Sequence, residues 1–350
     1  MKVTVLIDTY NHERFIERAI TSVLEQDMPL DDVEILVIDD GSTDRTPELV
    51  RCFEPRVRYL QKPNGGQASA FNFGFAQARG EIIATLDGDD RWTKEKLRRV
   101  LETLDANPEV GIVGHGFYEE YSHGRPDGLI LPGSFYRLDL TTQQDAELFR
   151  HVAAFFGTSR MTIRKSVLDR ILPVPEELTI EADEYIFTLA PALRPAIILN
   201  EPLCYYGMHP GNLFQFGKFE PAKARRKMKV LEVLIRELSA KLRQWGASEG
   251  IIDALFCGTR IEAGRIRLSL DGGSHLEAFS VERAAFKAAY STVTWRYQFF
   301  RAFVLLQTLL LPPRVFYRLR RWYTDKGLSR LRSWTGEPTR TVQVVERRPG

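Results

Sequence analysis

The first ninety residues alternate between short apolar runs and segments with helical periodicity, and this alternation constrains the fold more than any other feature. The runs are apolar along their whole length, as strands are when helices cover both faces of a parallel sheet. The strand–helix repeat is typical of α/β proteins. We therefore predict an α/β fold with a mostly parallel sheet flanked by helices. Strands are predicted at residues 3–7, 33–38, 57–60 and 81–86, and helices begin near residues 15, 46 and 67.

Polar residues follow three of these strands, at positions 8–11, 39–42 and 87–90. The carboxyl ends of parallel strands meet at one edge of a sheet, and ligands of such folds bind beyond that edge. Each cluster taken alone is also typical of an ordinary turn. Their common position at strand ends predicts one shared binding site.

The residues at this edge are mostly acidic. They are Asp8, Asp39, Asp40, Asp87, Asp89 and Asp90. No glycine-rich phosphate loop follows the first strand and no P-loop lysine is present, which disfavours dinucleotide-binding proteins and P-loop NTPases. Carboxylates repel a phosphate, but they hold one through a divalent cation that binds oxygen ligands. Asp87-Gly88-Asp89 offers two carboxylates on a tight loop, with a glycine that lets a ligand approach the backbone closely.

Five motifs occur in a fixed order along residues 3–105. They are Thr9-Tyr10-Asn11, Asp39-Asp40-Gly41-Ser42-x-Asp44-x-Thr46, Asn64-Gly65-Gly66 with Asn72-x-Gly74, Ala78-x-Gly80-Glu81, and Leu86-Asp87-Gly88-Asp89-Asp90-x-Trp92. This order resembles family-2 glycosyltransferases almost without gaps. The resemblance implies a GT-A fold that binds a nucleotide-diphosphate sugar and a divalent cation, Mg²⁺ or Mn²⁺.

The resemblance also implies roles for residues at the predicted edge. The donor-binding residues would be Asp8, Thr9, Tyr10, Asn11, Asp40, Gln67, Asp87 and Gly88. In that family the first loop and the second Asp of the Asp-Asp-Gly-Ser turn hold the nucleobase and ribose, and the Asp-x-Asp motif reaches the metal-bound diphosphate. Asp89 and Asp87 are the expected metal ligands. Asp8 stands where the family usually has proline, so the nucleotide base stays open.

The second half of the family pattern is weaker. A carboxylate at a helix start serves as catalytic base in the inverting members, and the resemblance favours Asp183 in Glu181-Ala182-Asp183-Glu184. Glu181 and Glu184 are competing candidates. A solvated helix N-terminus, where acids are stabilised by the helix dipole, is the alternative interpretation. Thr158-Ser159 resembles the segment that lines the acceptor side.

His209 lies in a further segment that resembles the family. Residues 205–212 resemble the family's Tyr-Arg-x-His-x-x-Asn segment, with Tyr206 in place of the arginine. His209 would then bind the metal or contact the diphosphate, and a purely structural loop histidine is the equal alternative.

The implied enzyme is a metal-dependent, inverting glycosyltransferase. It would move a sugar to an acceptor hydroxyl during synthesis of a cell-surface glycan, polysaccharide or glycolipid. Two other functions stay open: a catalytically silent nucleotide-sugar or glycan-binding module, and a nucleotidyltransferase. No nucleic-acid partner is expected.

The domain organisation follows from a change in character near residue 217. Residues 1–217 are predicted as the GT-A catalytic domain, with a donor half at about 1–105 and an acceptor half at about 106–217. The acceptor half is expected to contain a loop-rich insert at 119–145 and two short strands near residues 196–199 and 203–206. Residues 218–323 are predicted as helical, and 324–350 as a basic, partly disordered tail.

The net charge of +2 is the sum of a basic C-terminal region and an acidic remainder of the chain. Residues 291–350 hold 12 Lys and Arg against 3 Asp and Glu, a net +9, and the preceding 290 residues carry −7. The apolar, aromatic segment 295–311, followed by clustered arginines, suits peripheral contact with an anionic membrane. A helix packed on the catalytic domain is the competing interpretation. The sequence contains no signal-peptide core and no run of roughly 18 apolar residues. We therefore expect the protein to be located in the cytoplasm, at the inner face of the membrane.

Overall fold

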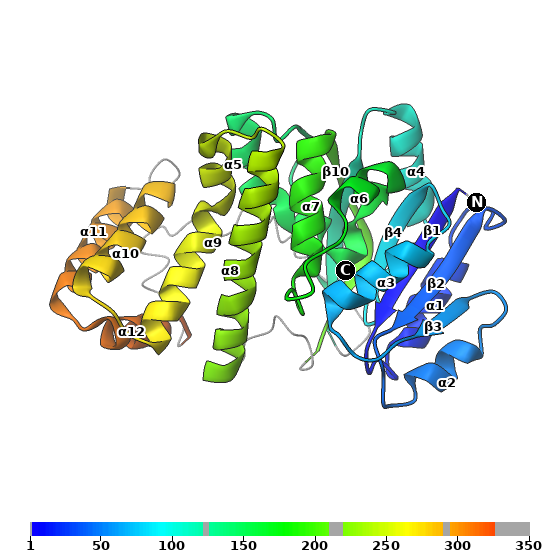
Figure 1. The fold of residues 1–350 in the computed structure, drawn as a ribbon, viewed down its shortest axis with the longest axis horizontal. Coiled ribbons are helices and arrows are strands. Elements are labelled where there is room, and N and C mark those ends of the chain that lie inside the picture. Colours follow the sequence, from blue (N-terminus) through cyan, green and yellow to red (C-terminus); the bar gives the residue numbers. More distant parts are fainter. Residues whose placement is uncertain (1, 122–125, 210–219, 290–294, 326–350) are drawn as a thin grey trace, which may run out of the picture. The chain divides into compact units, whose positions relative to one another are not determined.

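The computed structural model describes residues 2–121, 126–209, 220–289 and 295–325 (Figure 1). The described chain forms two compact units. The first comprises residues 2–121, 126–209 and 240–247, and the second comprises residues 220–239, 248–289 and 295–325. The predicted boundary at 217 and nearly all of the predicted tail at 324–350 lie outside the described residues.

A parallel sheet forms the first half of the first unit, as the apolar runs predict. Its strands are β1 (Val3–Thr9), β2 (Val33–Asp39), β3 (Arg58–Gln61) and β4 (Ile82–Asp87), in the spatial order β3-β2-β1-β4. The register pairs Asp8 of β1 with Asp87 of β4, and Thr9 with Asp39 of β2. The three polar clusters therefore do converge at one sheet edge.

Helices cover both faces of this sheet. They are α1 (Ile16–Leu24), α2 (Thr46–Arg51), α3 (Gln67–Gln77) and α4 (Lys96–Ala106). On one face, Ile16 and Ile20 of α1 recur at helical spacing and join Val5 and Ile7 of β1 in the main core. On the other face, α3 approaches so closely that a β-carbon at Gly74 would lie 2.6 Å from Leu6 Cδ1.

The second half of this unit extends the sheet. Beside β4 lie β9 (Thr162–Arg164), β6 (Ile112–Tyr121), β10 (Ala196–Met208) and β5 (Arg91–Trp92), while β7 (Pro126–Ile130) pairs with β6 and β8 (Tyr136–Leu138) with β10. The helical elements here are α5 (Gln143–Val152), α6 (Lys165–Ile171), α7 (Ala182–Leu193) and the 3₁₀ turns η1 (Ala153–Phe156) and η2 (Thr158–Arg160). The sheet as a whole is mixed but mostly parallel.

Two local predictions were wrong in this half. The supposed loop-rich insert at 119–145 contains the end of β6, then β7, β8 and the start of α5. The two short strands predicted at 196–199 and 203–206 are one strand, β10, with an irregularity between Leu199 and Pro202. The acidic residues at the end of β6 do not fit the apolar pattern expected of a buried strand. Glu120 is buried there because it pairs with Arg18 and Arg91.

The second unit is helical. It contains α8 (Pro221–Gln244, up to residue 239), α9 (Glu249–Leu270), α10 (His275–Ala289), α11 (Trp295–Leu310) and α12 (Pro313–Asp325). Leu268, Ala278, Phe316 and Tyr317 form a small core. Buried Glu282 is neutralised by Arg265 and Arg320. Among the described helices, none combines the length and the apolar character that crossing a bilayer requires.

Candidate active site

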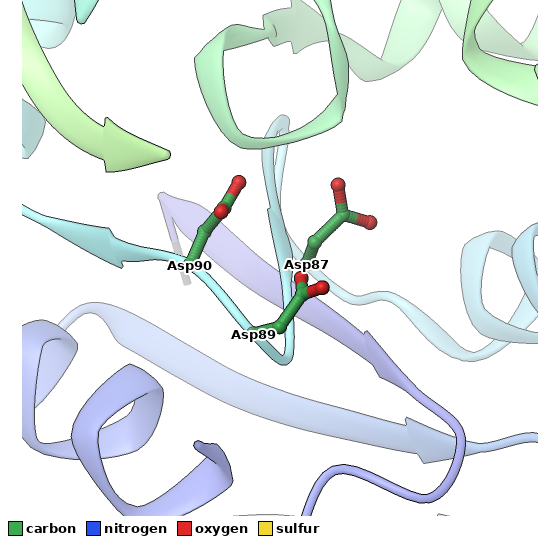
Figure 2. Close-up of side chains that lie close together, drawn as sticks. All are labelled: Asp87, Asp89 and Asp90. Carbon is green, nitrogen blue, oxygen red and sulfur yellow. The ribbon is translucent and has the colours of Figure 1, made fainter. Parts of the chain in front are cut away.

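The loop after β4 carries three carboxylates that face one another. Asp87, Asp89 and Asp90 each offer an oxygen, and these oxygens all lie within 4.8 Å of one another. Figure 2 shows the three side chains projecting from this turn. Asp90 was not among the sequence-predicted ligands. Its Oδ1 accepts the Gly207 N–H at 2.7 Å, which joins the loop to the end of β10.

Asp8 adds a fourth acid beside Asp87. Burial, followed by the charge of Asp89, raises the pKa of Asp8 to about 8. Burial and then Asp89 also raise the pKa of Asp90 to about 7. Oδ1 of Asp8 and Oδ2 of Asp90 are buried and accept no hydrogen bond from any described residue. Buried, crowded carboxylate oxygens with no donor are the ligands that a divalent cation requires, so the residues fit the implied metal.

Two histidines face the same oxygen of Asp89. Nε2 of His209 lies 3.0 Å from Asp89 Oδ2, and Nε2 of His12 lies 3.9 Å from it. Burial raises the pKa of Asp89, but the His209 hydrogen bond and both histidines outweigh it, so the pKa is lowered. The ring of Phe15 stacks on His209 at 4.5 Å. The structure thus brings His209 to the acidic loop and adds His12, which the sequence did not single out.

The glycine of the Asp-x-Asp motif packs against the first loop. A β-carbon at Gly88 would lie 2.7 Å from Thr9 Oγ1 and 2.8 Å from His12 Nδ1. These two atoms are themselves 3.2 Å apart. In this structure Gly88 therefore makes room for Thr9 and His12.

The rest of the first loop is held by the turn after β2. Asn11 adopts a left-handed backbone conformation with φ of 56°. Its N–H donates to Ser42 Oγ, and its Oδ1 accepts the Thr43 N–H, both at 2.8 Å. Tyr10 is exposed beside it. Asn11 thus joins the two loops, while Tyr10 is accessible to a ligand.

Asp40 is engaged with the segment before α3. Its carboxylate accepts hydrogen bonds from Lys62 Nζ at 2.7 Å, from the Gly65 N–H at 3.0 Å and from the Gly66 N–H at 2.7 Å. A nucleotide that binds Asp40 would donate its hydrogen bonds to the same carboxylate as these three groups. Lys62 was missed by the sequence reasoning, and its position two residues before Asn64-Gly65-Gly66 is the signal that could have found it.

Asp183 lies in the first turn of α7. Its Oδ2 accepts the Thr158 N–H at 2.9 Å and the Thr158 hydroxyl at 3.1 Å, and its Oδ1 accepts the Glu184 N–H at 3.0 Å. Burial raises the pKa of Asp183, although these hydrogen bonds and the charge of Arg160 oppose the shift. Glu181 precedes it with a left-handed φ of 57°. Asp183 is thus a partly desolvated carboxylate in a fixed position.

The turn η2 links Asp183 to the acidic loop. Thr158 and Ser159 are 3% and 1% exposed, so they offer little surface to a ligand and instead hold neighbouring segments together. Thr158 binds Asp183, and Ser159 Oγ accepts the Asp87 N–H at 3.0 Å. Gln67 supports the same turn, because its Nε2 donates to Thr158 Oγ1 at 3.2 Å and its Oε1 accepts the Ala182 N–H at 2.9 Å.

Arg160 brings a positive charge to this acidic region. Its guanidinium carbon lies 4.5 Å from the centre of the Phe117 ring and 5.5 Å from that of Tyr206. Its charge opposes the upward pKa shifts of both Asp183 and Asp90. Sequence reasoning missed this residue, which directly follows Thr158-Ser159.

A groove of about 910 Å³ lies apart from these residues. None of the sequence-predicted site residues lines it. Its polar and aromatic lining includes Arg18, Arg91, Arg99, Tyr118, Glu201 and Tyr205. The chemistry-bearing carboxylates are therefore concentrated at the sheet edge, outside this groove.

The fold and the acidic loop define the class of protein. A parallel sheet whose loop after β4 gathers carboxylates is the GT-A fold of nucleotide-diphospho-sugar transferases, as the sequence predicted. The structure is similar to that of S. aureus TarS 1–349 in complex with UDP-GlcNAc, with a TM-score of 0.60 at 19% identity over 94% of this chain and 92% of that one. It is also similar to the mannosyltransferase PcManGT from Pyrobaculum calidifontis in complex with GDP-Man and Mn²⁺, with a TM-score of 0.53 at 19% identity over 96% and 88% of the two chains.

The particular family follows from the sequence match. Residues 4–171, slightly less than half of the chain, match the model of glycosyl transferase family 2, so this part of the chain is a glycosyltransferase domain of that family. An uncharacterised glycosyltransferase of Nostoc is 34% identical over 227 residues, which cover 61% of this chain and 66% of that relative. The match thus spans slightly less than two thirds of the relative's length.

Proposed function

We propose that the protein is a metal-dependent, inverting glycosyltransferase that uses a nucleotide-diphosphate sugar. The observation that carries this proposal is the link through η2 between the acidic loop and Asp183. Ser159 contacts the backbone of Asp87, and the adjacent Thr158 contacts the carboxylate of Asp183. One short turn therefore fixes a candidate base relative to a candidate diphosphate site, as a direct displacement requires.

The proposed donor site is the edge formed by β1, β2 and β4. Asp8, Thr9, Tyr10, Asn11 and Asp40 would contact the nucleotide, with Gln67, Asp87 and Gly88 nearby. The solved neighbours hold UDP-GlcNAc or GDP-Man, which supports a nucleotide-sugar donor and leaves the base open.

The proposed cation is Mg²⁺ or Mn²⁺, held by Asp89 and Asp87 with His209. When bound, a divalent cation would neutralise the diphosphate and so favour its departure. The Mn²⁺ in the mannosyltransferase structure supports this assignment.

The proposed reaction is a single displacement at the anomeric carbon. Asp183 accepts the proton of the acceptor hydroxyl as the acceptor oxygen bonds to the anomeric carbon. The bond between that carbon and the diphosphate oxygen breaks, and the nucleoside diphosphate leaves with the electron pair. Attack from the opposite face inverts the anomeric configuration.

The proposed acceptor is a glycan or a lipid-linked saccharide used for a cell-surface polymer. A relative that is 34% identical over 220 residues, S. aureus TarS, is a poly(ribitol-phosphate) β-N-acetylglucosaminyltransferase, and its name supports a hydroxyl group on a polymer as the acceptor. We further propose that residues 1–217 form the catalytic domain, with donor and acceptor halves at about 1–105 and 106–217. In this proposal the helical region 218–323 makes peripheral contact with the inner face of an anionic membrane.

A donor panel tests the proposal. The purified chain is incubated with UDP-glucose, UDP-GlcNAc, GDP-mannose and ATP, with Mn²⁺ or with EDTA, and nucleotide release and thermal shift are measured. We expect one nucleotide sugar to raise the melting temperature and release its nucleoside diphosphate only with Mn²⁺. Release of pyrophosphate from ATP when glucose 1-phosphate is added, with transfer of the AMP group to the sugar phosphate, would favour a nucleotidyltransferase. Binding of a donor without turnover on any saccharide acceptor would favour a silent binding module.

A further inference from the structure

Helix α11 exposes an apolar face. Phe303, Leu306 and Leu310 are 53%, 55% and 70% exposed, and Leu309 beside them is 41% exposed. The spacings of three and seven residues place Phe303, Leu306 and Leu310 on one side of the helix. Residues 302–311 contain no charged side chain. The solvent-exposed side of a surface helix normally carries polar and charged residues. The exposed side of α11 carries apolar residues instead.

Helix α12, which follows α11 after a short turn, also exposes aliphatic side chains. Val315 and Leu319 are 44% and 51% exposed, one turn apart on α12. Arg314 and Arg318, also exposed and one turn apart, directly precede them in sequence. The neighbouring Phe316 and Tyr317 are buried in the core of the unit, so Val315 and Leu319 lie outside that core. The exposed side of α12 thus carries a row of arginines next to a row of aliphatic side chains.

We propose that these exposed residues of α11 and α12 form a docking face for an anionic lipid bilayer. The docking face consists of Phe303, Leu306, Leu309, Leu310, Arg314, Val315, Arg318 and Leu319. The inference rests on the membrane contact proposed above and names the residues that make it. Apolar side chains would enter the boundary between headgroups and acyl chains, while arginines beside them would contact the lipid phosphates.

The charge of the region favours a bilayer over a second copy of the chain. Residues 291–350 carry a net +9, and each basic residue near an anionic leaflet adds attraction. A symmetric dimer through the docking face would bring two copies of the same arginine row into one interface. The like charges would then repel, whereas lipid phosphates complement them.

Vesicle sedimentation of the full chain tests the inference. Vesicles of phosphatidylglycerol and phosphatidylcholine in equal amounts are compared with phosphatidylcholine alone, at low and high salt. We expect binding to the anionic vesicles only, with loss of binding at high salt. The double variant Leu306→Asn/Leu310→Asn should lower the partition coefficient at least about tenfold, because two exposed leucines no longer enter the apolar layer. Arg318→Gln should weaken binding and flatten its salt dependence.

A matched control and a second measurement keep the test decisive. Phe135→Asn changes an exposed apolar residue of the first unit, 56% exposed, and should bind vesicles like the unaltered chain. Absence of binding to anionic vesicles at low salt, or equal binding by the leucine variant, would overturn the inference. Loss of a dimer in the leucine variant during light scattering, without a lipid effect, would identify a second copy as the occupant. Release of nucleotide from the donor in solution is measured in parallel, so that failure of the proposed reaction is seen separately.

Discussion

Asp183 shows how a single carboxylate can be both desolvated and held in place. Burial raises its pKa, and three hydrogen bonds from Thr158 and Glu184 keep its orientation. We expect Asp183→Asn to lower kcat by about 10²–10⁴-fold, the usual contribution of a general base, while donor affinity is kept. Steady-state transfer and calorimetric titration of the donor measure the two effects. Glu184→Gln is the matched control, and a larger loss in that variant would place the base at Glu184.

The raised pKa of Asp183 also predicts two opposite pH effects. Transfer should rise with pH as Asp183 loses its proton, because only the carboxylate accepts one from the acceptor. Stability should change the other way. The folded-state pKa lies above the unfolded value, so stability is lost as pH rises from the ordinary aspartate pKa, about 3.9, through the raised one. Thermal melts across this range should show a smaller loss for Asp183→Asn, and equal losses would contradict the burial effect.

Asp89 is the carboxylate on which the proposed metal site depends most, because both histidines face it. We expect Asp89→Ala to lower the affinity for Mn²⁺ and for donor in the presence of Mn²⁺ by at least about 100-fold, the upper end of what loss of a supporting residue costs. Calorimetric titration measures both affinities. Asp169→Ala, which removes an exposed carboxylate paired with Lys165, should titrate like the unaltered chain. An unchanged titration of Asp89→Ala would remove Asp89 from the metal site.

At the residue scale, the sequence predicted the groups that are positioned by strand ends. Asp8, Asp87 and Asp89 follow apolar runs, and a parallel register brings such positions together whatever the rest of the chain does. His12 and Arg160 could not be predicted in this way. Their positions depend on packing between distant segments, His12 against Gly88 and Arg160 against Phe117.

At the scale of elements, a helix or strand was predicted correctly when its sequence pattern did not depend on residues elsewhere in the chain. Helix α1 was expected to begin near residue 15 and spans Ile16–Leu24, since its apolar stripe is complete within the segment itself. The end of β6 was missed because Glu120 is acidic and its burial depends on Arg18 and Arg91, which lie on other elements. The irregularity at Leu199–Pro202 hid the continuity of β10 for the same reason, because the parallel pairing with β6 resumes beyond it.

Gln67 tests whether the start of α3 positions the base or binds the donor. Its side chain supports Thr158 and the start of α7, so we expect Gln67→Ala to lower kcat about tenfold with the donor KM unchanged. In the Asp183→Asn background the same change should cause no further loss. Gln143→Ala, at the exposed start of α5, is the matched control. A raised donor KM with unchanged kcat would instead support the donor-binding role expected from the sequence.

At the scale of the whole molecule, the two units have separate cores. Val5, Ile7 and Ile20 belong to one, and Leu268 and Phe316 to the other. We expect calorimetry to resolve two unfolding transitions, of which UDP or GDP with Mn²⁺ raises only one. A ligand at 100 times its Kd stabilises the folded unit that binds it by about 2.7 kcal/mol. Ligand with EDTA is the control, and an equal shift of both transitions would contradict the separation.

The turn η2 has a consequence for how this molecule can change. Thr158 and Ser159 are neighbours in the chain, so a single peptide unit, about 3.8 Å between α-carbons, sets the spacing between the contact to Asp183 and the contact to Asp87. One inserted residue at this point would uncouple the two while leaving each intact. Exchange of the β7–β8 segment for that of a relative leaves the spacing untouched. Sequence changes in the outer strands can therefore leave the spacing of the contacts to Asp183 and Asp87 unaltered.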